Sequence, residues 1–572
     1  MLDTLISIYG PQEGREAFRR IELLLEGLPV DPDRNSPRFS ATDAMLITYG
    51  DTLNAPGTAP LQVLGRFLES RLQGVFPLLH ILPFFPSSSD DGFAVTDYYA
   101  VDPLLGDWAD IEALGRSHRL VVDFVLNHIS AQSAWVLRYL AEEGRFKALA
   151  LEADPQADFS RVMRPRIHPL LTPLVKGSGN GVHVWTTFSA DQIDINYRSI
   201  DILLEMVAVL LFYLQSGASV IRLDAVAYLF KEIGTACIHL PATHAMVRLL
   251  RQILERAAPR AMLLTETNVP HEENARYFGN GHDAAQLAYN FTLAPLLLHA
   301  LLTGEGRTLS NWARTLTPLS RETAWVNFSA SHDGIGLRPL EGLLPPEAVA
   351  RLVAHGLANG GQVSYKTNPD GSQSPYELNV TYIDALKGPG RDPWHVPRVL
   401  ASQAVEFALP GIPATYIHTL LGSRNWSAGV ARTGRARSIN REKLQVSKVM
   451  AQLADPASFR SRIFSPYLHM ISIRQAQPAF HPHAEFEVLD LDPRIFALKR
   501  WAYGQQIIAL TNLSAQPVAL DLSADVGGGP FEELLSRSVQ APGAMRLAPY
   551  QVAWLSAPIR KYDDLRPPIH PG

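Results

Sequence analysis

Three short segments, far apart in the chain, each end an apolar run with an acidic side chain. The acidic residues at these ends are Asp224, Glu266 and Asp333. Two carboxylates held about 5 to 5.5 Å apart can break a glycosidic bond with retention, because one attacks the sugar carbon while the other protonates the departing oxygen. Together the three segments indicate transfer of a sugar unit through a covalent intermediate.

The neighbours of two of these acids suggest a division of labour. Arg222 lies two positions before Asp224, on the same face of a strand, so its charge would hold that carboxylate ionised, as a nucleophile requires. Glu266 ends the apolar run 262–264, where partial burial would raise its pKa towards that of a working acid. Each residue alone has an ordinary alternative, a structural ion pair or a solvated strand end. Their joint occurrence favours catalysis.

Short apolar runs that alternate with longer helical patterns would carry these residues. The runs are rich in Val, Ile and Leu and cover residues 45–49, 80–84, 120–126, 219–223, 261–265, 325–329 and 414–418. This alternation predicts an α/β fold with a parallel sheet, a (β/α)8 TIM barrel. The candidate residues follow the runs, so we expect them together at the C-terminal face of the barrel.

Other parts of the chain lack this alternation of short apolar runs and helical patterns. Residues 130–195 contain four prolines between positions 155 and 173, which predicts a subdomain inserted after the third strand that could form one wall of a pocket. After residue 485, short alternating strands separated by Gly, Pro and Asn predict an antiparallel β domain. The expected divisions are 1–40 (an extension with a helix at 13–28 and a proline-bearing stretch), 41–485 (barrel, with the insertion at about 130–195), 486–560 (β domain) and 561–572 (a loosely ordered tail).

Composition limits the kinds of molecule that the protein is expected to bind. The 51 basic and 56 acidic residues give a net charge of −5 without a long block of one sign, which argues against a nucleic-acid or membrane surface and favours a small substrate. The single cysteine, Cys237, excludes an intrachain disulfide and is expected to be buried. The start carries Asp3 and no basic region, and the apolar stretch 206–214 is too short to span a bilayer, so we expect a cytoplasmic protein.

Four motifs in order resemble those of the α-amylase family, glycoside hydrolase family 13. They contain Asp123, Asn127 and His128; Arg222 and Asp224; Glu266; and His332 and Asp333. The resemblance spans about residues 40–560. It implies that Asp224 is the nucleophile, Glu266 the acid/base and Asp333 a third carboxylate that grips hydroxyls of the distorted sugar. It also implies that His128 and His332 donate to sugar hydroxyls near the reacting carbon.

Residues 89–98 resemble a narrower group, the sucrose phosphorylase-like subfamily. This resemblance implies that Asp91 binds the glucose 4-hydroxyl, that Phe93 is an aromatic platform, and that Arg441 pairs with Asp91. Such a pair would close the pocket after one glucosyl unit. Phe188 and Gln192 would then form the wall supplied by the inserted subdomain.

The segments around the leaving group differ from those of sucrose phosphorylases. Tyr376 is followed by Glu377 where those enzymes carry a glutamine that faces fructose or phosphate, and an acid there disfavours fructose. Residues 416–425 and 437–443 are more similar to the glucosylglycerate and glucosylglycerol phosphorylases of the subfamily. The resemblance therefore favours a short polar acceptor, glycerate before glycerol and fructose.

Phosphate as second acceptor needs cations or hydrogen-bond donors near the sugar carbon. The candidates are Arg338, Lys366 and Tyr228, and for the two cations the alternative is ordinary surface charge. The expected activity is a retaining glycoside phosphorylase that makes α-D-glucose 1-phosphate from a small α-glucoside and phosphate, without a metal or organic cofactor, as a monomer or homodimer. The alternatives are a hydrolase or transglucosylase on the same scaffold, and a catalytically silent barrel used for protein interaction.

Overall fold

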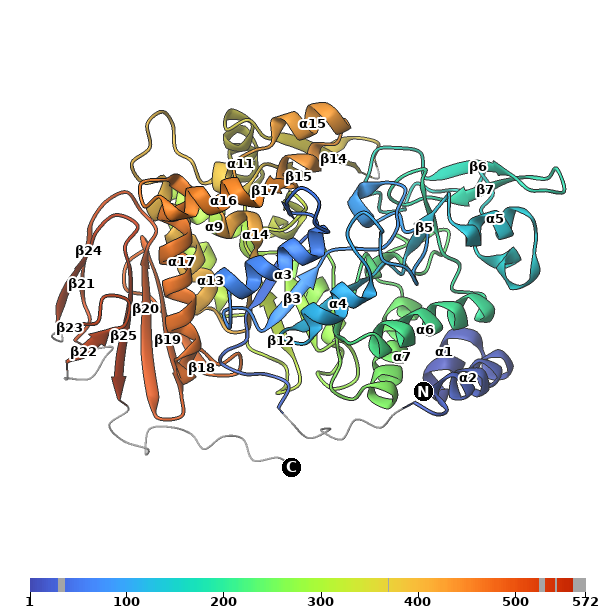
Figure 1. The fold of residues 1–572 in the computed structure, drawn as a ribbon, viewed down its shortest axis with the longest axis horizontal. Helices are drawn as coiled ribbons and strands as arrows, with labels where there is room; N and C mark the ends of the chain where they lie inside the picture. Colours follow the sequence, from blue (N-terminus) through green and yellow to red (C-terminus); the bar gives the residue numbers. More distant parts are fainter. Residues whose placement is uncertain (29–36, 369, 524–529, 541–542, 559–572) are drawn as a thin grey trace.

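The computed structural model describes residues 1–28, 37–368, 370–523, 530–540 and 543–558. Its centre is a closed barrel of parallel strands in the order β1-β16-β12-β11-β10-β9-β4-β3 (Figure 1). The barrel strands are β1 (Met45–Thr48), β3 (Leu78–Ile81), β4 (Arg119–Phe124), β9 (Ala218–Leu223), β10 (Met262–Thr265), β11 (Leu287–Asn290), β12 (Ala324–Asn327) and β16 (Ile412–Tyr416). The predicted (β/α)8 fold is confirmed, and most strand residues are buried, as expected of parallel strands covered by helices.

One barrel strand, β11, was missed in the sequence. It is only four residues long, and the chain runs almost directly from it into the equally apolar helix α9 (Leu293–Thr303). Because only Phe291 and Thr292 separate the two elements, hydrophobic periodicity alone merges them. The bounds of the other barrel strands lie within three residues of the predicted runs.

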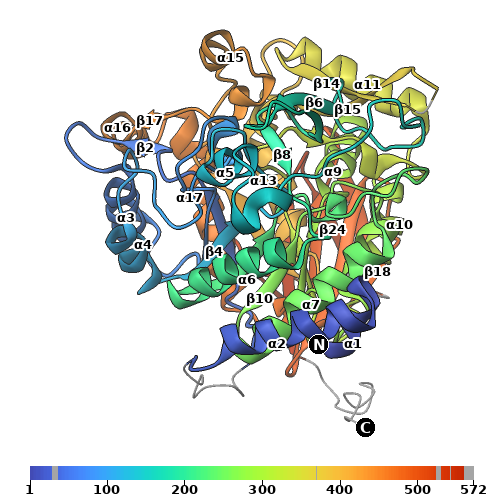
Figure 2. The same ribbon diagram turned by 90° about the vertical axis from the view of Figure 1, so that its right-hand side faces the viewer.

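Two N-terminal helices pack against the outside of the barrel. They are α1 (Leu2–Tyr9) and α2 (Pro11–Leu25), and they lie against α7 (Pro241–Ala257) and α6 (Ile200–Gln215), as Figure 2 shows. The helix predicted at 13–28 therefore begins and ends earlier, because Pro11 suits a first helical turn. At Gly14 a Cβ atom would lie 2.7 Å from the Ile6 backbone, so the close crossing of the two helices requires glycine. Residues 29–36 of the proline-bearing stretch lie outside the described residues.

The predicted insertion lies between β4 and α6. Its elements are β5 (His128–Ser130), α5 (Ala134–Leu140), β6 (Leu171–Val175), β7 (Gly181–Trp185) and β8 (Gln192–Asp194). The strands pair as β5 with β8 and β6 with β7, and the β6–β7 hairpin extends away from the barrel (Figure 1). A second hairpin, β14 (Gln362–Thr367) and β15 (Gln373–Asn379), meets the insertion through an isolated bridge between Arg164 and Thr367. The two segments thus approach each other over the C-terminal face of the barrel.

An antiparallel sheet in the order β18-β19-β20-β25-β22-β23 forms the C-terminal part, at the opposite side of the molecule from the insertion (Figure 1). The strands of this part are β18 (Glu485–Leu489), β19 (Ile495–Ala502), β20 (Gln505–Asn512), β21 (Val518–Asp521), β22 (Phe531–Glu533), β23 (Ser538–Gln540), β24 (Ala544–Leu547) and β25 (Val552–Pro558). The buried Arg500 of β19 donates to the Ala408 carbonyl at 2.7 Å and so links the sheet to the barrel. Residues 559–572 of the predicted tail lie outside the described residues.

Composition also led to expectations about the single cysteine and about membrane-spanning helices. Cys237 is a buried free thiol, as expected. Within the part of the chain that the structure describes, no helix combines the length and the apolar content needed to cross a bilayer.

Candidate active site

The three candidate carboxylates line one pocket at the C-terminal face of the barrel, with an empty volume of about 660 Å³. Asp224 directly follows β9, Glu266 directly follows β10, and Asp333 lies in the loop after β12. The Glu266 carboxylate accepts a hydrogen bond of 3.0 Å from the backbone N–H of Ala225, which ties it to the turn after Asp224. Ala225 has a left-handed φ of 50°, a strained conformation of the kind that collects at functional sites.

Asp224 is held from one side by Arg222. Its Oδ1 atom lies 2.9 Å from Arg222 Nη1, and the same guanidinium also pairs with the buried Asp123. Burial nevertheless raises the pKa of Asp224 to about 7, against the opposing effect of Arg222. The predicted contact is present, but Arg222 does not by itself keep the pKa of Asp224 low, because burial outweighs it. Arg222 divides its charge between two carboxylates, and Asp333 is close enough to oppose ionisation.

Burial also raises the pKa of Glu266 to about 7, as predicted for a general acid. Asp224 adds to this effect through like-charge repulsion. The two carboxyl groups therefore titrate as a pair that holds one proton near neutral pH. This state suits a nucleophile beside an acid.

Asp333 has the opposite electrostatic environment. Its Oδ1 atom lies 2.5 Å from Arg437 Nη1 and 3.4 Å from Arg441 Nη2. Burial would raise the pKa of this carboxyl, but Arg437 and Arg441 outweigh burial and lower it. Asp333 is thus a fixed negative charge. The Phe93 and His332 rings stack beside it at 4.9 Å.

The predicted ion pair between Asp91 and Arg441 is present at 2.7 Å. However, the pocket is lined by Asp90 and not by Asp91, so the assignment of Asp91 to the sugar was wrong by one position. Both acids have a left-handed φ, 54° and 48°, in a tight turn that directs the two side chains differently. Arg441 Nη1 also lies 3.4 Å from Asp90 Oδ1, so this arginine contacts both acids of the turn.

The inserted subdomain supplies a wall, as predicted, and His128, Phe188 and Gln192 line the pocket there, next to Tyr228 from the segment after β9. Gln192 Nε2 lies 3.2 Å from His128 Nε2, which itself lies 3.0 Å from the Phe93 carbonyl oxygen. Phe188 meets Tyr228 edge to face at 5.5 Å. The arrangement fixes His128 and presents two aromatic rings to a ligand.

Three residues predicted near the leaving group or phosphate do not line the pocket. Glu377 is 2% exposed and accepts two hydrogen bonds from Arg437, so the prediction that it faces the acceptor was wrong. Arg338 is buried and donates to Glu273 at 3.0 Å, and Lys366 donates to Glu341 at 2.6 Å. Of the residues predicted around the leaving group, only Tyr376 and Tyr228 line the pocket.

Two arginines that sequence reasoning missed do line the pocket, Arg166 and Arg437. Arg437 lies one helical turn before Arg441, in a segment already singled out, so its spacing could have revealed it. Arg166 belongs to the irregular, proline-bearing insertion and carries no such signal. Its guanidinium lies 5.7 Å from the rings of both Phe188 and Tyr376, and no carboxylate of the described residues is within ion-pair distance of it.

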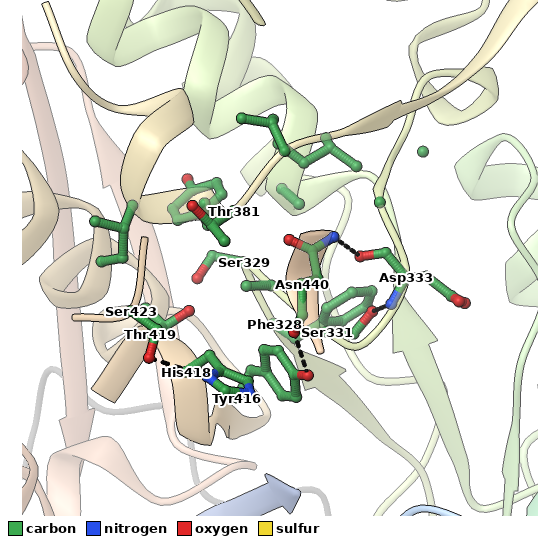
Figure 3. Close-up of a pocket in the computed structure, with 18 of the residues that line it drawn as sticks. Phe328, Ser329, Ser331, Asp333, Thr381, Tyr416, His418, Thr419, Ser423 and Asn440 are labelled. Carbon is green, nitrogen blue, oxygen red and sulfur yellow. Dashed lines mark hydrogen bonds between the residues drawn. The ribbon is translucent and has the colours of Figure 1, made fainter. Parts of the chain in front are cut away.

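A second cavity, lined by both polar and apolar side chains, lies behind Asp333, between the ends of β12 and β16 (Figure 3). Its wall holds the Asp333 backbone, because Asn440 donates to the Asp333 carbonyl at 3.0 Å and the Asp333 N–H donates to Ser331 Oγ at 3.2 Å. Tyr416 donates in turn to the Asn440 carbonyl at 2.7 Å. The loop that carries the third carboxylate is therefore fixed from its far side.

The closed parallel barrel brings two buried carboxyl groups, Asp224 and Glu266, together at its C-terminal face, an arrangement that fits the class of enzymes that act on glycosides. The family model described as the catalytic domain of alpha amylase matches residues 76–327. A glucosylglycerate phosphorylase of Allomeiothermus silvanus is 42% identical over 97% of this chain and 98% of its own length, and one of Escherichia coli is 41% identical over 97% and 99%. The crystal structure of sucrose 6F-phosphate phosphorylase from Thermoanaerobacter thermosaccharolyticum superposes with a TM-score of 0.74 at 24% identity, covering 84% of this chain and 96% of that one. The chain belongs to the α-amylase family, glycoside hydrolase family 13, and to its branch of glycoside phosphorylases.

Proposed function

We propose that this protein is a retaining glycoside phosphorylase that converts 2-O-α-glucosylglycerate and phosphate into glycerate and α-D-glucose 1-phosphate. The relatives named glucosylglycerate phosphorylase match it over nearly their whole length. The observation that carries the proposal is the pocket-lining Arg166, which has no carboxylate partner among the described residues. The guanidinium donates to the neighbouring Pro165 carbonyl at 3.0 Å, and a cation without an acid beside it in such a pocket fits a ligand with a negative charge.

The first step breaks the bond between the glucosyl carbon and the leaving oxygen. Asp224 attacks that carbon through a carboxylate oxygen, while the proton of Glu266 passes to the oxygen of the departing glycerate. Arg222 fixes the orientation of Asp224, and the Ala225 N–H fixes that of Glu266. The product of this step is a β-glucosyl ester of Asp224 with Glu266 ionised.

The second step transfers the glucosyl unit to phosphate. A phosphate O–H gives its proton to Glu266 as its oxygen attacks the sugar carbon and the bond to Asp224 breaks. Two inversions give the α-anomer. The shared proton of Asp224 and Glu266 is restored, so the pair is ready for the next donor.

The pocket fits a single glucosyl unit. Asp90, Phe93 and His332 surround the sugar side, and the ion pair of Arg441 with Asp91 closes the pocket behind them. We assign Asp90, in place of Asp91, to a sugar hydroxyl. Asp333, held between two arginines, would accept hydrogen bonds from two further hydroxyls of the distorted ring.

Glycerate and phosphate would occupy the same place in turn, beside Arg166, Phe188 and Tyr376. Both are small anions, so one guanidinium serves both steps. Glycerol or fructose would leave Arg166 without a charged partner. This difference favours glucosylglycerate over glucosylglycerol and sucrose as donor.

The remaining expectations belong to the proposal. The partners are a small glucoside and phosphate, the subunit acts as a monomer or homodimer, and the protein works in the cytoplasm, where sugar phosphates are used. Residues 1–40, 41–485 and 486–560 form its structural divisions.

Incubation with phosphate and, separately, glucosylglycerate, glucosylglycerol and sucrose tests the proposal. We expect glucose 1-phosphate from glucosylglycerate at a kcat/KM at least roughly tenfold above that of the other donors, as expected for one charge-assisted hydrogen bond. A hydrolase would give free glucose, a transglucosylase would give longer glucosides, and a silent barrel would give neither. Absence of glucose 1-phosphate from all three donors would refute the proposal.

A further inference from the structure

Glu377 and Asp333 are joined by a single arginine. The Glu377 carboxylate accepts hydrogen bonds from Arg437 Nε at 3.0 Å and from Nη2 at 2.6 Å. The remaining Arg437 nitrogen, Nη1, lies 2.5 Å from Asp333 Oδ1. One guanidinium thus spans two carboxylates, one that is 2% exposed and one that lines the pocket.

The backbone of the loop after Asp333 packs closely on the Glu377 side chain. Glu377 lies on β15, opposite Gly336 of the short strand β13 (Ile335–Gly336). The neighbouring Gly334 packs so closely on it that a Cβ atom there would lie 2.7 Å from Glu377 Cγ and 3.0 Å from Oε1. The loop that follows Asp333 therefore covers the Glu377 side chain and leaves Arg437 as its charged partner.

The charges around Asp333 show what this pairing does. Arg441 is balanced by Asp90 and Asp91, and Arg437 is balanced by Glu377, so Asp333 lies between two guanidinium groups that are each held by another acid. Glu377 accepts two hydrogen bonds from one edge of the Arg437 fork and so holds the fork in its plane. A bidentate pair fixes orientation as well as charge.

We infer that Glu377 is a positioning residue, which acts on the reaction only through Arg437 and Asp333 and does not touch the leaving group or phosphate. This inference takes the proposed function as given. It also removes an apparent conflict, because an acid beside an anion-binding pocket would repel glycerate and phosphate if its charge were free. Paired with Arg437, Glu377 fixes the third carboxylate without opposing either anion.

A double-mutant cycle on Glu377→Ala and Arg437→Ala tests the inference. We expect Glu377→Ala to lower kcat/KM for phosphorolysis roughly 10- to 100-fold, the range of one charge-assisted hydrogen bond. In the Arg437→Ala background the same change should add less than about threefold. If the two substitutions lowered kcat/KM independently, so that their factors multiplied in the double variant, the inference would be overturned. Glu341→Gln, which alters another glutamate paired with a cation but away from the pocket, is the matched control and should leave kcat/KM unchanged.

A second readout separates positioning from direct contact. In the synthetic direction, from glucose 1-phosphate, Glu377→Gln should lower transfer to glycerate and to glycerol by the same factor. A shift of roughly tenfold or more in their ratio towards glycerate would show that Glu377 faces the acceptor and would contradict the inference. Because glutamine has the same shape, this comparison remains decisive if Glu377→Ala fails to fold. Wild-type protein is assayed first, so a failed proposed function would appear as missing glucose 1-phosphate before any variant is compared.

Discussion

The two sides of the pocket are built from different parts of the chain. The strand side, formed by Asp224, Glu266 and Asp333, follows directly from barrel strands, and each charge there is balanced or protonated. The loop side, formed by Arg166, Phe188 and Tyr376, comes from the insertion and the β14–β15 hairpin. On that side the one guanidinium lacks a carboxylate partner among the described residues.

This difference between the two sides of the pocket separates the chemistry of bond cleavage from the choice of acceptor. In the proposed function, the strand ends set the chemistry, cleavage with retention, because carboxylates must be held at a fixed separation for it. The loops would set the acceptor, because they would supply the charge that meets the leaving group and phosphate. A change on the strand side should reduce every reaction, whereas a change on the loop side should affect only anionic acceptors.

The largest effect is expected for Glu266→Gln. Loss of the general acid should lower kcat/KM for glucosylglycerate by roughly 10²-fold or more, since glycerate is a poor leaving group. A donor with an activated leaving group, such as 4-nitrophenyl α-glucoside, should lose far less in its release of nitrophenol. Equal losses for both donors would show that Glu266 is not the acid.

A smaller effect is expected for Arg166→Ala. Removal of the guanidinium should raise KM for phosphate and for glycerate roughly 10- to 100-fold, while transfer of glucose to glycerol changes little. Initial rates with each acceptor measure this, and Arg161→Ala, an exposed arginine of the same insertion, is the matched control. If Arg166→Ala lowered transfer to glycerate and to glycerol by the same factor, the loop side would not be selective for anionic acceptors.

The smallest effect concerns stability. Burial raises the pKa of Asp224 and Glu266 to about 7, from ordinary values of 3.8 and 4.5, so the folded protein holds protons that the unfolded chain releases. Their contribution is full below about pH 4 and is lost as the pH rises through 7. Glu266→Gln should therefore raise Tm at pH 8 by roughly 1 to 3 °C and leave it nearly unchanged at pH 4. A lower Tm at pH 8 would contradict the assigned environment.

The sequence predicted the strand side far better than the loop side, for a physical reason. Asp224 and Glu266 directly follow largely apolar strands, and a parallel barrel brings such ends together whatever the loops do. Arg166 follows no periodic pattern, so only the folded insertion brings it to the pocket. Residues 90 and 91 are both aspartate, and only the backbone of their turn distinguishes them.

Glu377 shows a second limit of prediction from the sequence alone. The glutamine that sucrose phosphorylases carry at this position suggested contact with the acceptor, but alternate residues of a strand point to opposite faces. Tyr376 therefore lines the pocket while Glu377 turns to Arg437. The pairing depends on residues sixty positions apart, and no local pattern contains it.

Analysis of the products from 2-O-α-glucosylglycerate and excess phosphate by NMR tests the central claim most directly. Retaining phosphorolysis predicts α-D-glucose 1-phosphate in an amount equal to the glycerate released, with little free glucose. Formation of the β-anomer would contradict the roles of Asp224 and Glu266. Release of free glucose in place of the phosphate ester would contradict the role of Arg166 and the assignment as a phosphorylase.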